Sequence, residues 1–263
     1  METENTKSSL DLLGIQPISK AIDTTVEKSF QGVEGFLQKV CVPALEELGL
    51  MFRDKLRNWR LKNIIQIIEK SKGKLDFQNE QLELKMQAHP RVALGIINNG
   101  SVVDDEELQN MWAGLFASSC TKEGQDDENL IFVNLLKQLT VSEARILNYA
   151  CSSCKKQLYR DGLITSWDLH IDFKSLTEIS GVCEFYRLDR ELDHLNSLGL
   201  IGEDDFEVGF IGDELDANIT PTALALNLYV KCQGHNIDPR FYWKNDIRTE
   251  EELEKEREEQ ASR

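Results

Sequence analysis

Apolar residues at intervals of three and four positions predict that most of the chain is helical. The first stripe of this kind lies in residues 15 to 40, with charged residues on the other side of the same segment. It consists of Ile15, Ile18, Ile22, Val26, Phe30, Val33, Leu37 and Val40. We expect an amphipathic helix that packs on its own protein; a helix lying on a membrane or against a second copy is the alternative.

A second, longer helix is predicted for residues 43 to 72. Pro43 suits a first helical turn, and no strong helix breaker follows before Gly73. One face carries a basic stripe, which consists of Arg53, Arg57 and Arg60. An adjacent apolar face carries Leu56, Trp59 and Ile67.

Three shorter apolar segments follow, and each predicts a helix. His89-Pro90 opens the first, which stops at residues 98–100. The second spans residues 104–120, with acidic residues in its first turn and Met111 and Trp112 on its apolar face. The third covers residues 130–139. The sequence therefore predicts a helical region over residues 43–139.

Helix start and stop signals divide residues 140–234 into four further helices. Thr140 and Glu143 have the spacing of a capping box. Asp172 can start a second helix that Gly181 ends, and a third helix from Cys183 to Leu198 is followed by Gly199, a C-terminal cap. Thr220-Pro221 reads as an N-cap with a first-position proline for the last helix, which closes at Gly234.

Three helices, a short extended connection and a closing helix are the order of a winged-helix domain. The predicted fold class is therefore mainly α, with an N-terminal helical region and a C-terminal winged-helix-like domain (a helix-turn-helix with a short β wing). The expected parts are an amphipathic segment (1–42), a helical region (43–139), the winged-helix-like domain (140–234) and a charged tail (235–263).

The net charge changes how the basic stripe is interpreted. The 263 residues carry a formal charge of −16, which disfavours binding of nucleic acid or anionic lipid by the bulk surface. The candidate contacts to a partner or an anion are Arg53, Arg57, Arg60 and Lys62. Because acidic residues are abundant in the chain, we favour internal salt bridges and packing for this stretch over an external phosphate or nucleic acid.

Charge also bears on the winged-helix-like domain. Residues 140–234 contain eight basic and sixteen acidic residues, and seven of the acids lie in the expected wing. Such a wing would repel the phosphate backbone of DNA. We therefore expect this domain to contact protein or to be structural, although DNA binding is not excluded.

No pattern in the sequence predicts an active site, a metal site or a cofactor. The six cysteines are scattered and are expected to be reduced thiols in a cytoplasmic protein. Cys151 and Cys154 form a CxxC pair inside a predicted helix, without a second pair at zinc-site spacing. The sequence also lacks GxSxG, HExxH and glycine-rich phosphate motifs. An enzyme is not excluded, but a non-enzymatic role is favoured.

Three stretches together resemble a bacterial family, the Abi-alpha or abortive infection alpha proteins. They are ELGLMFRDKLRNWRLKNIIQIIEK (47–70), EELQNMWAGLFASS (106–119) and FVNLLKQLTVSEARILNYA (132–150). The likeness covers roughly residues 40 to 234 and appears in the family's order. Its characteristic positions include Leu56, Trp59, Met111 and Trp112, which we expect to be core residues.

The resemblance implies a role in defence against phage, in which the infected cell stops growing or dies before progeny are released. It supplies no catalytic residues. We expect a non-enzymatic protein that binds a protein partner or itself. The alternatives are a winged-helix DNA-binding regulator and a peripheral membrane effector that uses the N-terminal amphipathic helix.

Overall fold

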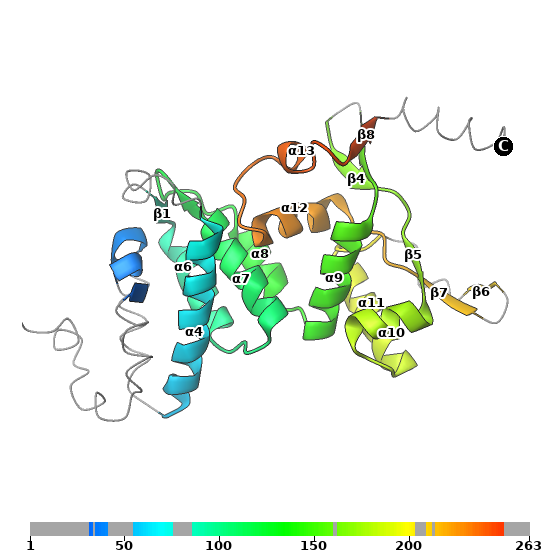
Figure 1. Ribbon diagram of the computed structural model, residues 1–263, viewed down its shortest axis with the longest axis horizontal. Helices are drawn as coiled ribbons and strands as arrows, with labels where there is room; N and C mark the ends of the chain where they lie inside the picture. The colour runs from blue at the N-terminus through cyan, green and yellow to red at the C-terminus, as the bar shows by residue number, and fades with distance from the viewer. Residues whose placement is uncertain are drawn as a thin grey trace, which may run out of the picture. The chain divides into compact units, whose positions relative to one another are not determined.

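The computed structural model describes residues 32–33, 35–41, 55–75, 86–159, 162–202, 209–211 and 214–249 (Figure 1). These residues form two compact units, with the division between Lys137 and Gln138. Both units are mostly helical, with small sheets. No helix among the described residues has the length and apolar content needed to cross a bilayer.

The first unit is a set of packed helices with one two-residue strand pair. Its elements are α4 (Lys55–Lys74), β1 (Gln87–Ala88), α6 (Pro90–Gly100), α7 (Glu106–Ser118), β2 (Cys120–Thr121) and α8 (Leu130–Leu136). The strands β1 and β2 pair antiparallel. Helix α4 packs along α7, and α6 and α8 also contact α7, so α7 is the centre of the unit.

Helix α7 forms where the sequence predicts it and is almost completely buried. Asp105 caps its first turn by accepting from the backbone N–H of Leu108 at 3.1 Å, and two glutamates follow at the positive end of the helix dipole. All residues from Met111 to Ser118 are buried. Trp112 and Phe116 are the largest of these side chains, and they fill the core of the unit.

The described end of the N-terminal amphipathic stripe also belongs to this core. Residues 32–33 and 35–40 are helical, and Val33, Leu37 and Val40 are buried. Phe36 lies beside Phe116, with ring centroids 6.2 Å apart. This part of the stripe therefore packs on the protein itself. The rest of the stripe, on which the membrane alternative rests, and the expected helix start at Pro43 lie outside the described residues.

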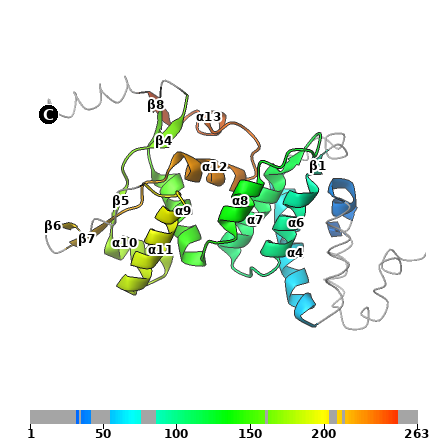
Figure 2. The same cartoon turned by 180° about the vertical axis from the view of Figure 1, so that it is seen from behind.

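The second unit combines helices with two three-stranded sheets. Its elements are α9 (Val141–Ser153), β3 (Lys156–Leu158), β4 (Ile164–Ser166), β5 (His170–Asp172), α10 (Phe173–Ser180), α11 (Phe185–Ser197), β6 (Gly209–Ile211), β7 (Glu214–Asn218), α12 (Ala223–Cys232), α13 (Pro239–Tyr242) and β8 (Ile247–Thr249). One sheet has the order β4-β3-β8 and the other has the order β5-β7-β6. Helix α12 contacts both α9 and β4 (Figure 2).

Most of the predicted helix boundaries in this unit are confirmed. Thr140 and Glu143 form the reciprocal capping box. Asp172 caps α10 through the backbone N–H of Ser175, and α10 ends at Gly181 in the left-handed conformation (φ 74°). Gly199 follows α11 with φ 68°, a region that glycine enters without steric cost.

The predicted start of the last helix is wrong. Thr222, not Thr220, is the N-cap of α12, and its side chain accepts from the backbone N–H of Ala225 at 3.2 Å. Thr220 is instead turned toward Asn218, whose side-chain oxygen accepts from the Thr220 backbone. Pro221 forms an isolated bridge with Ile201, because a proline φ also fits an extended chain.

No helix or strand was predicted for residues 155–171, and residues 235–249 were expected to belong to a charged tail. The structure has the hairpin β3–β4 in the first of these segments and α13 and β8 in the second. Strand β8 pairs parallel to β3, with Lys156 opposite Ile247. Residues 235–249 therefore fold back onto the body of the second unit.

Candidate functional site

The basic stretch predicted to contact a partner is only partly visible. Arg53 lies outside the described residues, and Arg57 and Leu56 belong to α4 without a described side chain. Lys62 is exposed. Arg60 is half-buried, and its Nε donates to the Ser101 hydroxyl at 2.9 Å.

Arg60 is therefore a structural residue of the first unit. The side-chain amide of Asn63, on the same helix, donates to the Ser101 carbonyl at 3.0 Å. Together they fix α4 to the turn that follows α6. We expected acidic partners for this stripe; the partner that the structure shows for Arg60 is a neutral hydroxyl.

The characteristic positions of the family resemblance that were expected in the core divide into two groups. Met111 and Trp112 are buried in α7, as expected. Trp59 is 41% exposed and does not belong to the core of the described residues, contrary to our expectation. Each residue turns a helix by about 100°, so the buried Leu61, Ile64 and Ile68 share one side of α4 and Trp59 lies opposite.

The CxxC cysteines lie in an apolar environment at the end of α9. Burial raises the pKa of the Cys151 thiol well above its usual value, and burial also raises the pKa of Cys154 although Lys156 opposes the shift. Cys120, in the first unit, is buried too, and its pKa rises to about 12. Buried thiols of this kind are poor nucleophiles. Within the described ranges, no group of three or more His, Cys, Asp or Glu residues could hold a metal ion.

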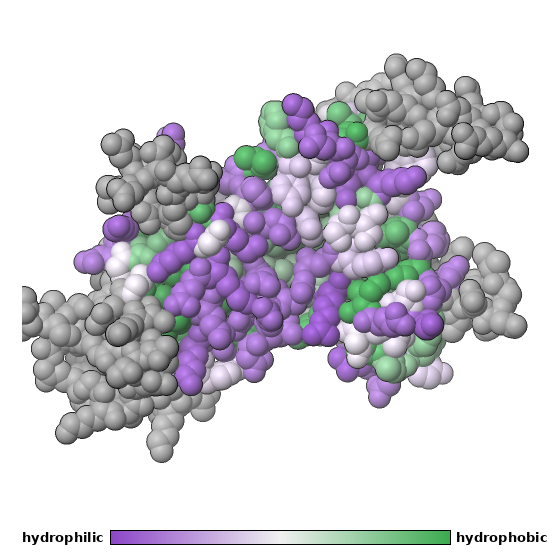
Figure 3. All heavy atoms as spheres, in the orientation of Figure 1, coloured by the Kyte–Doolittle hydropathy of each residue, from purple (hydrophilic) through white to green (hydrophobic). Residues whose placement is uncertain are grey.

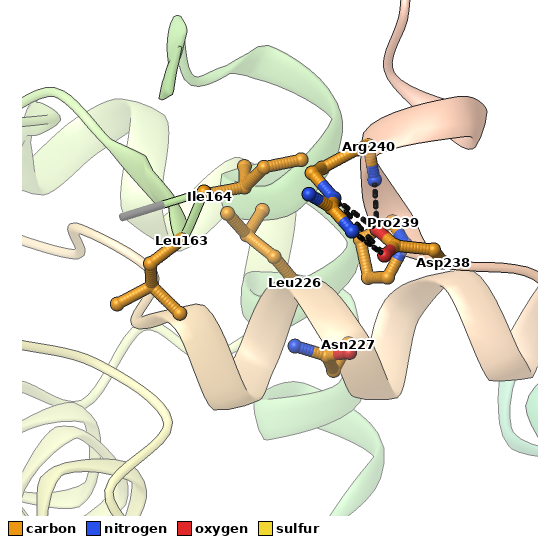
Figure 4. Close-up of a pocket in the computed structure, with 8 residues that line it drawn as sticks. Leu163, Ile164, Leu226, Asn227, Asp238, Pro239 and Arg240 are labelled. Carbon is orange, nitrogen blue, oxygen red and sulfur yellow. Dashed lines mark hydrogen bonds and ion pairs between the residues drawn. The ribbon is translucent and has the colours of Figure 1, made fainter. Parts of the chain in front are cut away.

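A groove in the second unit is the best candidate for a binding site. It has a volume of about 430 Å³ and lies between the start of β4, the middle of α12 and the start of α13 (Figure 4). It is lined by Gly162, Leu163, Ile164, Leu226, Asn227, Asp238, Pro239 and Arg240. Such a volume is within the range of ligand pockets, and half of the lining residues are apolar.

The polar wall of the groove is an ion pair. The Arg240 guanidinium donates to both carboxylate oxygens of Asp238, with its Nη2 2.6 Å from Oδ2 and its Nε 3.0 Å from Oδ1. These hydrogen bonds lower the pKa of Asp238. Asp238 also caps α13 through the Arg240 backbone N–H, so the pair is fixed in place. Gly162 lies against this pair with φ 87°, and a Cβ there would come within 3.1 Å of the Arg240 guanidinium.

Large apolar side chains surround the groove and face solvent. Phe241, next to Arg240, is 70% exposed, and Leu163 on the groove wall is 49% exposed. Ile237, next along the chain to Asp238, is also exposed. Figure 3 shows small separate hydrophobic patches among hydrophilic residues in the region of α13 and the connection that precedes it. An exposed apolar rim around a hollow is typical of a surface that binds another molecule.

This site was not predicted from the sequence, because residues 235–263 were expected to form a charged tail. The sequence nevertheless contains a local signal for a helix in this segment. Asp238-Pro239 is an N-cap followed by a first-position proline, and the apolar aromatic residues Phe241, Tyr242 and Trp243 come next. Three aromatic residues in succession are unusual in a solvated tail.

The comparison with protein families gives a match over most of the described structure. The model of the family described as abortive infection alpha matches residues 60–219, which is more than half of the chain. The chain belongs to the abortive infection alpha family. No curated protein and no solved structure matches it. The match ends just after β7, so the β4 wall of the groove lies inside the family region, whereas α12 and α13 follow it.

Proposed function

We propose that this chain acts in abortive infection by binding another protein through the groove of its second unit. Family membership supports the defence role. The apolar rim around the groove carries the binding role, because exposed phenylalanine and leucine side chains next to a hollow lose unfavourable hydration when a partner covers them. The role needs no catalytic residue.

We also propose that the second unit is a winged-helix module. The order α9, β5, α10, α11, β6, β7 supports this architecture, as does the sheet order β5-β7-β6, in which the last strand lies between the other two. A buried contact supports it further. The Glu143 carboxylate of α9 lies 2.7 Å from His194 Nδ1 of α11, which holds α11 against α9.

The exposed face of α11 favours protein over DNA as its partner. Its outward stripe consists of Tyr186, Arg190, Asp193 and Ser197. The helix contains two arginines and three carboxylates, and Arg187 is already paired with Glu191 at 3.0 Å. Phosphate binding requires an excess of free basic groups. Tyrosine and arginine beside an acid are instead common at protein interfaces. Five of the seven acidic residues expected in the wing lie outside the described residues, and the other two, Glu214 and Asp216, belong to β7.

A phage challenge tests the proposed function. Cells would carry the intact chain, a Leu163→Asp/Phe241→Asp variant, or the control Ile131→Asp, which changes an exposed apolar residue of α8 in the first unit. We expect the groove variant to lose protection and the control to keep it. Circular dichroism of all three proteins shows whether they are folded. Full protection by a folded groove variant would disprove a role for the groove.

DNA binding remains the second candidate, because the strand order that supports a winged helix is found in many DNA-binding proteins. Its test is retention of the intact chain by duplex DNA at about 50 mM salt, where electrostatic binding is strong. We expect no retention. Retention that Arg190→Glu abolishes would favour DNA as the partner of α11.

A further inference from the structure

The C-terminal part of the second unit is attached in an unusual way. Residues 238–249, which we call the strap, consist of α13, a turn and β8. The strap returns to the hairpin β3–β4 and supplies the third strand of that sheet. Three residues of β8 pair with β3 in parallel, from Lys156 opposite Ile247 to Leu158 opposite Thr249.

Two neighbouring aromatic side chains anchor the strap, and the Tyr242 ring lies 6.3 Å from that of Tyr229. Trp243 is buried and stacks on Tyr229 of α12, with ring centroids 5.5 Å apart and planes at 25°. On the β3 side, the Lys156 ammonium lies 3.9 Å from the centroid of the Trp243 ring, a cation–π contact. Tyr229 and Lys156 thus form a receptor for a single indole ring.

Lys156 is well suited to hold an aromatic ligand. Only 3% of the residue is exposed, although lysine is rarely buried without a partner. Its ammonium also donates to the Ser152 carbonyl at 3.3 Å. A buried ammonium that loses a partner is costly, so this site favours occupancy by an aromatic ring.

The rest of the strap is loosely held. No residue of α13 is buried, and Phe241 points to solvent. The strand β8 contributes only three paired residues. The connection before the strap, His235 to Ile237, is exposed. Attachment through two neighbouring aromatic side chains and one short strand resembles the binding of a peptide to a sheet edge more than the packing of a core element.

We infer that β3, Lys156 and Tyr229 form a peptide-binding site, which the strap fills in this structure and which a partner protein can take over. The ligand is a segment with a tryptophan at the start of a turn and, four residues later, a β-branched residue that begins a strand, which is the arrangement of Trp243 and Ile247. Strand pairing holds its backbone and the indole pocket selects its side chain. Because Asp238 and Arg240 of the strap also form one wall of the groove, the exchange opens the groove as well. The inference concerns the second unit alone and stands whether or not the chain acts in phage defence.

A cleavable full-length chain tests this inference. A protease site is inserted between Asn236 and Ile237, and the cut protein is mixed with a fluorescent peptide that has the sequence of residues 237–249. Without added peptide, we expect the C-terminal fragment to remain bound after cleavage. When the peptide is added, we expect it to replace the fragment. The same peptide with Trp243→Ala is expected to bind at least tenfold more weakly.

Two variants of the cut protein are the controls. Lys156→Gln keeps a polar hydrogen-bond donor but removes the charge, and it should weaken peptide binding. Lys155→Gln changes an exposed neighbour and should not. Circular dichroism shows whether the rest of the protein, without the C-terminal fragment, stays folded during the exchange. A folded body that never exchanges the fragment, equal binding of the two peptides, or a body that unfolds as the fragment leaves would each overturn the inference.

Discussion

Each unit has a buried tryptophan, but the most exposed large aromatic side chains among the described residues lie in the second unit. In the first unit, Trp112 and Phe116 of α7 are fully buried and hold the helices together. In the second unit, Tyr186 is 78% exposed on α11 and Phe241 faces solvent beside the groove. One stretch that marks the family thus builds a core, whereas the surfaces suited to a partner lie in the second unit and partly beyond the family match. A residue that identifies a family is therefore not by itself a residue that binds.

The largest expected effect tests this contrast within the first unit. Trp112→Ala removes a buried indole from α7, and we expect the free energy of unfolding to fall by about 3–5 kcal/mol. Trp59→Ala, the matched change at an exposed tryptophan, should cost less than about 1 kcal/mol. Urea unfolding of both variants measures the difference. Equal losses would mean that Trp59 is also a core residue.

A smaller effect is expected from the polar anchor of the second unit. Glu143→Ala removes the carboxylate that accepts from the Thr140 backbone at 2.7 Å and contacts His194. We expect a loss of about 2–3 kcal/mol, because a capping contact and a buried hydrogen bond disappear together. Glu178→Ala, at an exposed site of α10, is the control. Thermal unfolding of the two variants compares them; similar midpoints would contradict the anchor role.

Because α12 starts after Thr222, we expect a substitution of Thr222 to lower the free energy of unfolding by about 1 kcal/mol. Thr222→Ala removes the N-cap and the hydroxyl that donates to the Gly199 carbonyl at 2.6 Å, so stability should fall by about that amount. Pro221→Ala should change stability less, since Pro221 is not a first-turn residue of α12. Chemical denaturation of both variants decides between the two starts. The reverse order of effects would restore Pro221 as the first helical residue.

The smallest expected effect is a pH dependence of the groove wall. Arg240 lowers the pKa of Asp238 in the folded protein, so the carboxylate stabilises the fold at pH values above its unfolded pKa. That contribution is lost as the pH falls through the folded pKa. Asp238→Asn should therefore be less stable than the intact chain at neutral pH, with a difference that shrinks in acid. Unfolding midpoints measured from neutral pH into acid would show a constant difference if the ion pair contributed nothing.

Local sequence signals account for much of the helical fold. The acidic first turn of α7, the capping box at Thr140 and the glycines at 181 and 199 each act within about one helical turn, so each is readable from neighbouring residues. The N-cap and proline signal at Thr220-Pro221 predicted a helix start that the structure does not have. There the Thr220 backbone N–H donates to the side chain of Asn218, and the Pro221 carbonyl accepts from the Ser166 hydroxyl. Ser166 reaches Pro221 from a distant strand, and no local pattern contains that contact.

The sequence by itself determined the mainly helical class, most helix boundaries and the family. These follow from apolar periodicity, capping and short motifs, all of which are local. Only the tertiary structure decided which tryptophans are core, that Arg60 is bonded to Ser101, and that residues 238–249 close on β3. The groove belongs to this second group. Its walls come from three segments well separated in the chain, and the pairing of β8 with β3 depends on burial of Trp243 between Tyr229 and Lys156.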